Sequence, residues 1–169
     1  MSELFMGLDL SCTATGIVVI DADGLPVSYE TVGSSLSRKA PQRDRTERLI
    51  EIATKVVGAM QRTGCRNVAI EGASFNARGN QFDLGEVHGC VKTQLWLSFH
   101  VIPLVVPCSS ARQVAVGKLK GVQKGTVKRR VAELLADRLT KWPDLLSDED
   151  LVDAYVVAEW ARKKWPRRT

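Results

Sequence analysis

Four acidic residues stand in stretches of sequence that are otherwise apolar. Asp150 and Asp153 lie three residues apart in a segment with helical periodicity, so they would share one face of a helix. Asp9 interrupts an apolar run over residues 5–10, and Glu71 ends another short apolar segment. An isolated carboxylate in apolar surroundings is costly unless it is paired, protonated or bound to a metal ion. These four side chains are therefore candidate ligands of a divalent cation.

Carboxylates that lie close together repel one another, and some take up protons unless cations neutralise them. Ligand sets made only of oxygen select Mg²⁺ or Mn²⁺ rather than Zn²⁺. Two such ions about 4 Å apart can activate a water molecule and stabilise the leaving oxygen of a phosphodiester. The pattern thus predicts nuclease or phosphoryl-transfer chemistry with two ions per site. Taken singly, each acid has a structural alternative, because acids also cap helices and turns.

The helix that carries Asp150 and Asp153 is predicted to begin after Ser147 and to reach residue 161. Ser147 is the expected N-cap, and residues 148–150 fill the first turn with acids, where the helix dipole favours negative charge. The segment 151–161 is apolar on nearly every side, which is typical of a buried helix. We therefore expect both aspartates to project from a packed helix toward one point.

The remaining periodicity predicts an α/β fold. Strands are expected at residues 4–11, 16–20, 27–32, 67–71 and 101–106, and helices at 43–62, 83–99, 109–116 and 126–139. This order predicts a five-stranded mixed sheet, with three antiparallel strands plus two parallel ones, flanked by helices. If the first and fourth strands are parallel neighbours, their carboxyl ends bring Asp9 and Glu71 together. We expect one domain over residues 1–169.

The composition indicates a globular protein with a polyanionic partner. The chain has 169 residues, of which 44% are hydrophobic and 25% charged, and its net charge is +5. Basic residues cluster at 38–48, 118–130 and 163–168, which favours nucleic acid, although solubility alone explains any single cluster. Without an apolar run of membrane-spanning length or a signal-peptide pattern, we expect a cytoplasmic protein with no membrane partner.

The four cysteines are scattered along the chain. Cys12, Cys65, Cys90 and Cys108 have no CxxC spacing, so the sequence predicts neither a zinc site nor a disulfide framework. Four reduced cysteines fit the expected compartment.

Several short motifs resemble one known family, the RuvC-type Holliday junction resolvases of the ribonuclease H-like superfamily. The motifs are Gly7-Leu8-Asp9-Leu10-Ser11 with Thr15-Gly16, Ala69-Ile70-Glu71, Leu84-Gly85-Glu86-Val87-His88-Gly89, Arg112-Gln113-Val114, Lys124-Gly125-Thr126-Val127 and Asp150-Leu151-Val152-Asp153-Ala154. They follow in order over nearly the whole chain. The resemblance implies a ribonuclease H-like fold and an endonuclease that resolves four-way DNA junctions as a homodimer.

The resemblance also implies roles for individual residues. Asp9, Glu71, Asp150 and Asp153 would be the catalytic acids that bind Mg²⁺ or Mn²⁺. Lys124 would approach the scissile phosphate, and Phe75 would insert near the branch point; the alternatives are a solvated lysine and a core-packed phenylalanine. Further candidates for DNA-backbone contact, any of which is alternatively only solvated, are Arg78, Lys118, Lys120, Lys128 and Arg129.

The helix at residues 83–99 is the expected dimer face. It is rich in large apolar residues, namely Val91, Leu95, Trp96 and Phe99. The same residues would serve equally well in the intramolecular core, so both interpretations stay open.

Three other functions fit parts of the sequence. A nuclease for flaps, replication forks or other branched DNA would use the same acids. A junction-binding module without catalysis would use only the basic residues. The first strand and Thr15-Gly16 also resemble the phosphate loop of actin-like ATPases, but such enzymes need a second lobe that 169 residues cannot supply.

Overall fold

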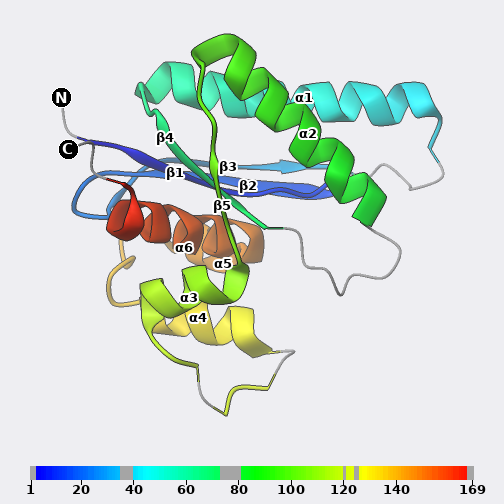
Figure 1. Cartoon of the computed structure of the whole chain (residues 1–169). Helices are drawn as coiled ribbons and strands as arrows, with labels where there is room; N and C mark the ends of the chain where they lie inside the picture. Colours follow the sequence, from blue (N-terminus) through cyan, green and yellow to red (C-terminus); the bar gives the residue numbers. More distant parts are fainter. Residues whose placement is uncertain (1–2, 35–39, 73–80, 120, 124–125, 167–169) are drawn as a thin grey trace.

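The protein is built around a five-stranded mixed sheet, as the sequence predicts. The structure, a computed structural model, describes residues 3–34, 40–72, 81–119, 121–123 and 126–166 (Figure 1). The strands are β1 (Phe5–Asp9), β2 (Ala14–Ile20), β3 (Pro26–Gly33), β4 (Asn67–Glu71) and β5 (Leu104–Val106). They lie in the order β3-β2-β1-β4-β5.

The direction of the strands places two acids side by side. β1 pairs with β2 and β2 with β3 in antiparallel fashion, whereas β1 with β4 and β4 with β5 are parallel. The last paired residues of β1 and β4 are Leu8 and Ile70. Asp9 and Glu71 each follow directly, so both stand at the carboxyl ends of neighbouring parallel strands.

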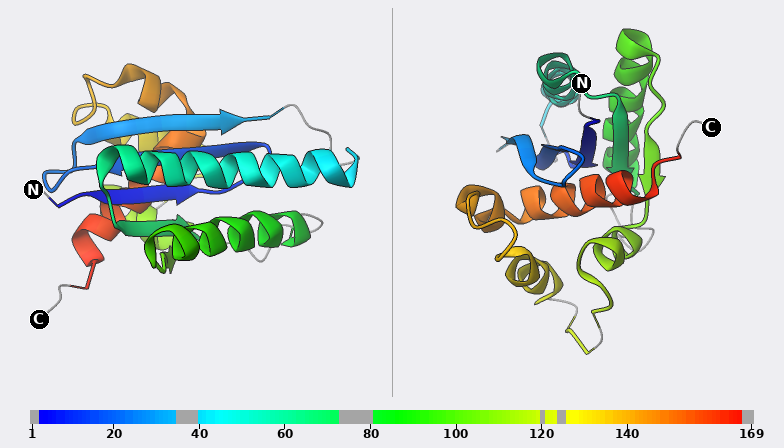
Figure 2. Two further views of the ribbon diagram at one scale, coloured as in Figure 1. Left: turned by 90° about the horizontal axis from the view of Figure 1, so that it is seen from above. Right: turned by 90° about the vertical axis from the view of Figure 1, so that its left-hand side faces the viewer.

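Helices cover both faces of the sheet. They are α1 (Gln42–Thr63), α2 (Gln81–Phe99), α3 (Cys108–Val116), α4 (Val127–Leu135), α5 (Pro143–Ser147) and α6 (Glu149–Lys164). α1 and α2 lie on one face, and α6 lies on the other with α3, α4 and α5 on its outer side (Figures 1 and 2). Within the described ranges, no helix has the length and apolar character needed to cross a membrane.

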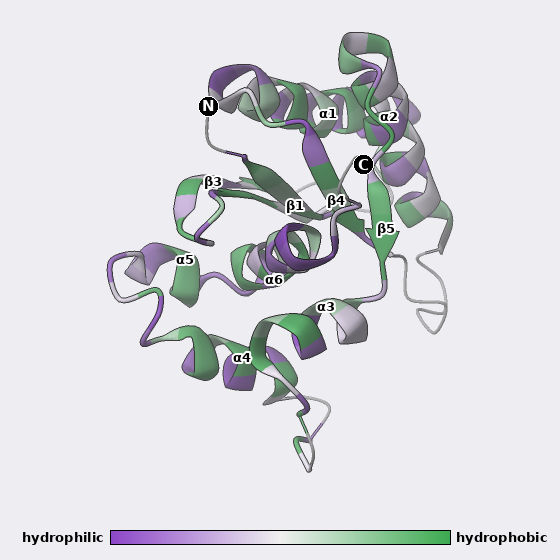
Figure 3. Cartoon of the chain, turned by 60° about the vertical axis from the view of Figure 1, so that its left-hand side comes forward, coloured by the Kyte–Doolittle hydropathy of each residue, from purple (hydrophilic) through white to green (hydrophobic). Residues whose placement is uncertain are grey.

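The position of α6 explains why its sequence is apolar on nearly every side. One core cluster joins α6 to β1, β2 and the helices α3–α5, and a second joins the opposite face of the sheet to α1 and α2. In Figure 3 apolar residues are seen on the strands and on α6. This helix lies between the sheet and the layer formed by α3, α4 and α5. Asp153 and Glu159 are the polar residues of α6 that are buried along with its apolar ones.

Two glycines let α6 approach the sheet closely. A Cβ atom at Gly7 on β1 would overlap the backbone of Ala154 and Ala158, and a Cβ atom at Gly16 on β2 would overlap the carbonyl of Asp150. Any larger residue would push the helix away. Close backbone approach therefore sets the height of the α6 acids above the sheet.

The start of α6 differs from the prediction by one residue. Asp148, not Ser147, is the N-cap, and its Oδ1 accepts hydrogen bonds from the backbone N–H groups of Asp150 (2.9 Å) and Leu151 (3.2 Å). Ser147 instead ends α5, a short helix that the sequence did not predict. Thr31 on β3 donates to Asp148 Oδ2 at 2.6 Å and so fixes the cap to the sheet.

Three further boundaries also shift. Pairing in β5 begins at Leu104 rather than at residue 101, because Pro103 has no N–H group to donate. α3 begins at Cys108, one residue before the predicted start. α4 ends at Leu135, four residues earlier than predicted.

Candidate metal centre and active site

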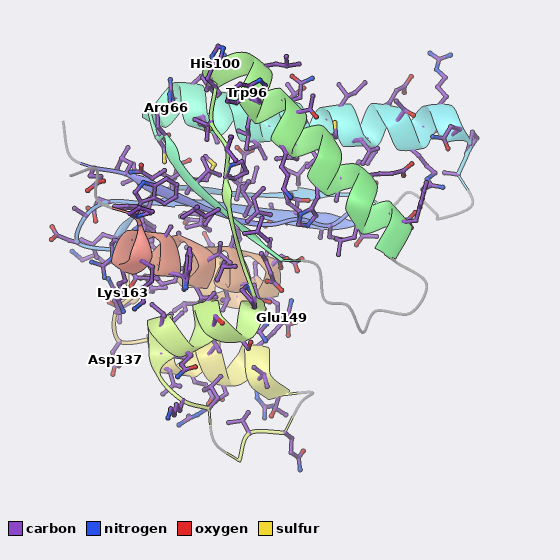
Figure 4. All side chains as sticks on the ribbon, viewed as in Figure 1. Arg66, Trp96, His100, Asp137, Glu149 and Lys163 are labelled. Atoms are coloured by element: carbon purple, nitrogen blue, oxygen red, sulfur yellow. The ribbon has the colours of Figure 1, made fainter. Side chains whose placement is uncertain are left out.

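The acidic residues singled out in the sequence converge at one end of the sheet. Asp9 ends β1, Glu71 ends β4, and Asp150 and Asp153 lie in the first turns of α6. Glu149, beside them in the first turn, is labelled in Figure 4 at the end of the molecule where β5 leads into α3. Asp9 interacts electrostatically with all three of the other acids.

Burial and mutual repulsion disfavour the ionised forms of Asp9, Glu71 and Asp150. Burial, followed by the charges of Glu71 and Asp153, raises the pKa of Asp9 to about 8. Burial and the charge of Asp153 also raise the pKa of Glu71. The pKa of Asp150 is raised mainly by burial, against the opposing attraction of Lys128. Burial and repulsion therefore favour protonation of Asp9, Glu71 and Asp150 where no cation neutralises them.

Two basic side chains neutralise Asp153, which is only 1% exposed. Arg112 on α3 donates from Nη2 to both carboxylate oxygens at 2.7 and 2.9 Å, and from Nε to Oδ1 at 3.1 Å. Lys128 on α4 lies 2.9 Å from Asp153 Oδ2 and 3.5 Å from Asp150 Oδ1. Burial alone would lower the pKa of Arg112 and of Lys128, but the charge of Asp153, its hydrogen bonds and the other nearby acidic groups together outweigh burial and raise both pKa values.

One buried oxygen of the acid cluster lacks a hydrogen-bond partner. Glu71 Oε2 is buried and has no hydrogen-bond partner among the described residues. Four carboxylates face two basic side chains in this part of the chain, so ionisation of every acid would leave negative charge uncompensated. A buried polar atom without a partner costs about 1–3 kcal/mol. The donor set and its charge thus fit a hard divalent cation.

A thiol lies among the acids. Cys108 is the first residue of α3, and donor atoms of Glu71, Cys108 and Asp153 all lie within 4.8 Å of one another. Burial and the charges of both acids raise the pKa of this thiol.

The expected DNA-binding residues have different positions. Lys128 contacts the acid cluster rather than facing only solvent. Lys118, which follows α3, and Arg129, on α4, are both exposed. The other residues proposed for DNA contact fall outside the described ranges, namely Phe75, Arg78, Lys120 and Lys124.

Sequence reasoning assigned no role in the site to Arg112 or Cys108. Arg112 lies on the helix predicted at 109–116, whereas Cys108 precedes it. Because α3 begins at Cys108, the spacing of four residues places both side chains on one face. Which face meets the acids depends on how α3 packs against α6.

The expected dimer face is only partly available. Val91 and Leu95 are fully buried in the core beneath α2, and Phe99 packs under Arg66, whose guanidinium carbon lies 4.4 Å from the ring centre. Trp96 remains 48% exposed and the adjacent Leu97 66% exposed. The interior interpretation therefore holds for Val91 and Leu95, because helical spacing turns them toward α1 and the sheet.

Comparison with known proteins gives a likeness of fold. No protein-family model and no curated protein matches the chain. Among solved structures, Thermus thermophilus RuvC matches with a TM-score of 0.70 at 20% identity, covering 95% of this chain and 96% of that one. The chain shares the fold of RuvC. The ribonuclease H-like architecture predicted from the sequence is thereby confirmed.

Two similar structures contain DNA. T. thermophilus RuvC in complex with a Holliday junction substrate matches with a TM-score of 0.69 at 19% identity over 95% of this chain and 96% of that one. A Fowlpox virus resolvase in complex with Holliday junction DNA matches with a TM-score of 0.55 at 10% identity, over 95% of this chain and 97% of that chain.

Proposed function

We propose that this protein is a structure-specific DNA endonuclease that resolves four-way junctions by paired, symmetric nicks. The observation that carries the proposal is the convergence of Asp9, Glu71 and Asp153 at the carboxyl ends of two parallel strands, in a chain with the fold of RuvC. Phosphodiester hydrolysis at such a site requires cations, which neutralise the repulsion among the acids.

Asp9, Glu71, Asp150 and Asp153 would hold Mg²⁺ or Mn²⁺, in a two-ion arrangement. The unpartnered Glu71 Oε2 and the raised pKa values of Asp9 and Glu71 support this assignment. Bound there, the ions would polarise the scissile phosphate and stabilise the charge of the leaving oxygen.

Arg112 and Lys128 would act through the carboxylates. Three N–H contacts from Arg112 hold Asp153 in one orientation, which makes the arginine a positioning residue. Lys128 is 35% exposed, so its ammonium group can serve both Asp153 and an incoming phosphate. Removing Lys128 should weaken cleavage more than binding.

Branched DNA would lie over the acid cluster and the basic residues around it. The net charge of +5 supports a polyanionic partner. The exposed Lys118 and Arg129 would contact the backbone, and we extend the same role to Arg78, Lys120 and Lys124, with Phe75 stacking near the branch point.

A cleavage assay tests the proposal. A synthetic four-way junction, a flap, a fork and a linear duplex are incubated with the protein and Mg²⁺ or Mn²⁺, beside Asp9→Asn and Asp153→Asn. Paired nicks at symmetric positions of the junction are expected from the wild type alone, with DNA binding retained by both variants. Equal cutting of flaps and forks would support the broader branched-DNA nuclease instead. Binding without cutting by the wild type with either metal would support the non-catalytic module.

A homodimer follows from the same proposal. A four-way junction offers two symmetric strands, and a two-fold enzyme places one site on each. We assign the contact to the exposed part of α2 around Trp96 and Leu97.

A further inference from the structure

Cys108 stands where an all-oxygen metal site would not need it. The chain passes from β5 through Pro107 directly into α3, which brings the thiol of Cys108 beside the end of β4. Donor atoms of Glu71, Cys108 and Asp153 lie within 4.8 Å of one another, a spacing that one metal ion can bridge. Three segments far apart in the sequence therefore meet at one point.

The second observation is the state of Glu71. Its Oε2 is buried and unpartnered among the described residues, although it lies in a group whose other acid, Asp153, is contacted on both oxygens. A thiol is a weak hydrogen-bond donor and does not replace a missing ligand. Cys108 and Glu71 share a side-chain hydrogen bond, and Oε2 of Glu71 still has no partner among the described residues.

Sulfur changes which cations such a group prefers. Carboxylate oxygens alone favour Mg²⁺ and Mn²⁺, whereas a thiolate adds strong preference for Zn²⁺ and softer ions. We propose that Glu71, Cys108 and Asp153 form a mixed oxygen–sulfur site for a thiophilic divalent cation such as Zn²⁺ or Cd²⁺. The cation forms a bond to Sγ, the thiol proton leaves to solvent, and no electron is transferred.

The site overlaps the one proposed for Mg²⁺, because Glu71 and Asp153 belong to both. A cation held through sulfur would occupy these carboxylates and exclude the hard ion, which makes Zn²⁺ an inhibitor of cleavage. Binding of the soft cation does not depend on nuclease activity. The two proposals can therefore fail separately.

Cadmium binding to the free protein tests the assignment. Cd²⁺ is titrated into the full chain without DNA, and the sulfur-to-cadmium charge-transfer absorption is followed for the wild type, Cys108→Ser and Cys90→Ser. Cys90 is the matched control, since it is also half-buried but lies on α2, across the sheet. The wild type and Cys90→Ser should saturate at one equivalent, and Cys108→Ser should lose that band. An unchanged titration of Cys108→Ser overturns the proposal.

Two further measurements complete the test. Glu71→Gln should require more Cd²⁺ for half-saturation, and an unaltered value would contradict the three-donor site. X-ray absorption of the wild type with one equivalent of Zn²⁺ should show a sulfur neighbour at about 2.3 Å. A shell of only oxygen and nitrogen would refute it, whether or not Cys108→Ser folds.

Discussion

The contact between Arg112 and Asp153 should contribute measurably to stability. Asp153 is 1% exposed and Arg112 17%, so water replaces little of their interaction once one partner is removed. Arg112→Gln, Asp153→Asn and the double variant form a cycle, measured by urea unfolding in chelator. We expect a coupling free energy of about 1.5–3 kcal/mol, the range for hydrogen bonds to charged groups.

The exposed pair Arg43 and Glu47 provides the control for that cycle. These side chains are 85% and 63% exposed and lie 2.8 Å apart on α1. Their coupling should be at most about 0.5 kcal/mol. Equal couplings for the two pairs would show that burial of Asp153 does not strengthen its contact with Arg112.

The stability of the cation-free protein should fall as the pH rises toward about 8, and Asp9 should be one cause. Its pKa is raised in the folded protein to about 8 from 3.8, so the folded state holds a proton that the unfolded chain releases. The resulting stabilisation is complete below the unfolded pKa and is lost as the pH rises through the folded one. The measurement is urea unfolding in chelator at several pH values.

Asp9→Asn is the reference for this pH dependence, because asparagine cannot titrate. The variant should lose less stability than the wild type across the window from about pH 4 to pH 8. Parallel curves for the two proteins would rule out Asp9 as a titrating group in this range.

The position of α6 depends on the small residue Gly7 beneath it. Gly7→Ala should lower the free energy of unfolding by about 2 kcal/mol or more, since its Cβ would overlap backbone atoms of Ala154 and Ala158. Moving α6 also moves Asp153 away from Asp9, so metal binding should weaken as well. Chemical unfolding and calorimetric titration with Mn²⁺ measure the two effects.

Gly58→Ala on α1 is the control for a methyl group added beside a flexible neighbour. The nearest atom to its new Cβ is Arg62 Nη1 at 3.2 Å, the far end of a long side chain. Helix propensity favours alanine by about 1 kcal/mol, so this variant should be neutral or slightly more stable. Similar losses at both glycines would argue against close packing as the cause at Gly7.

The elements themselves were largely predictable, because helices and strands each bury an apolar face whose residues recur at a characteristic spacing along the sequence. Boundaries were less so. Ser147 and Asp148 are both good N-caps, and Asp148 has the additional hydrogen bond from Thr31 on a distant strand. A helix as short as α5, with five residues, has too few turns to show periodicity. Local sequence cannot resolve choices that tertiary contacts make.

At the scale of the whole molecule, the sequence indicated the acids but not what surrounds them. Asp9 and Asp153 were visible because each interrupts an apolar run, and the predicted parallel pairing brought Glu71 to Asp9. Arg112 and Lys128 sit on amphipathic helices, on whose polar faces basic residues usually meet solvent. Their contacts with Asp153 arise from the docking of α3 and α4 on α6, which no local pattern specifies.

The exposed apolar surface of α2 should hold two copies of the chain together. Trp96 and Leu97 are 48% and 66% exposed, which is unusual for adjacent large apolar residues on a helix that already buries its other face. Leu97→Glu should convert a dimer to monomers in sedimentation equilibrium without lowering the free energy of unfolding of the monomer. Val27→Glu, on β3 at the far edge of the sheet and 52% exposed, should leave the dimer intact. Since one monomer carries one acid cluster, Leu97→Glu should also nick junction strands singly rather than in pairs. A wild type that sediments as a monomer at micromolar concentration would contradict this assignment.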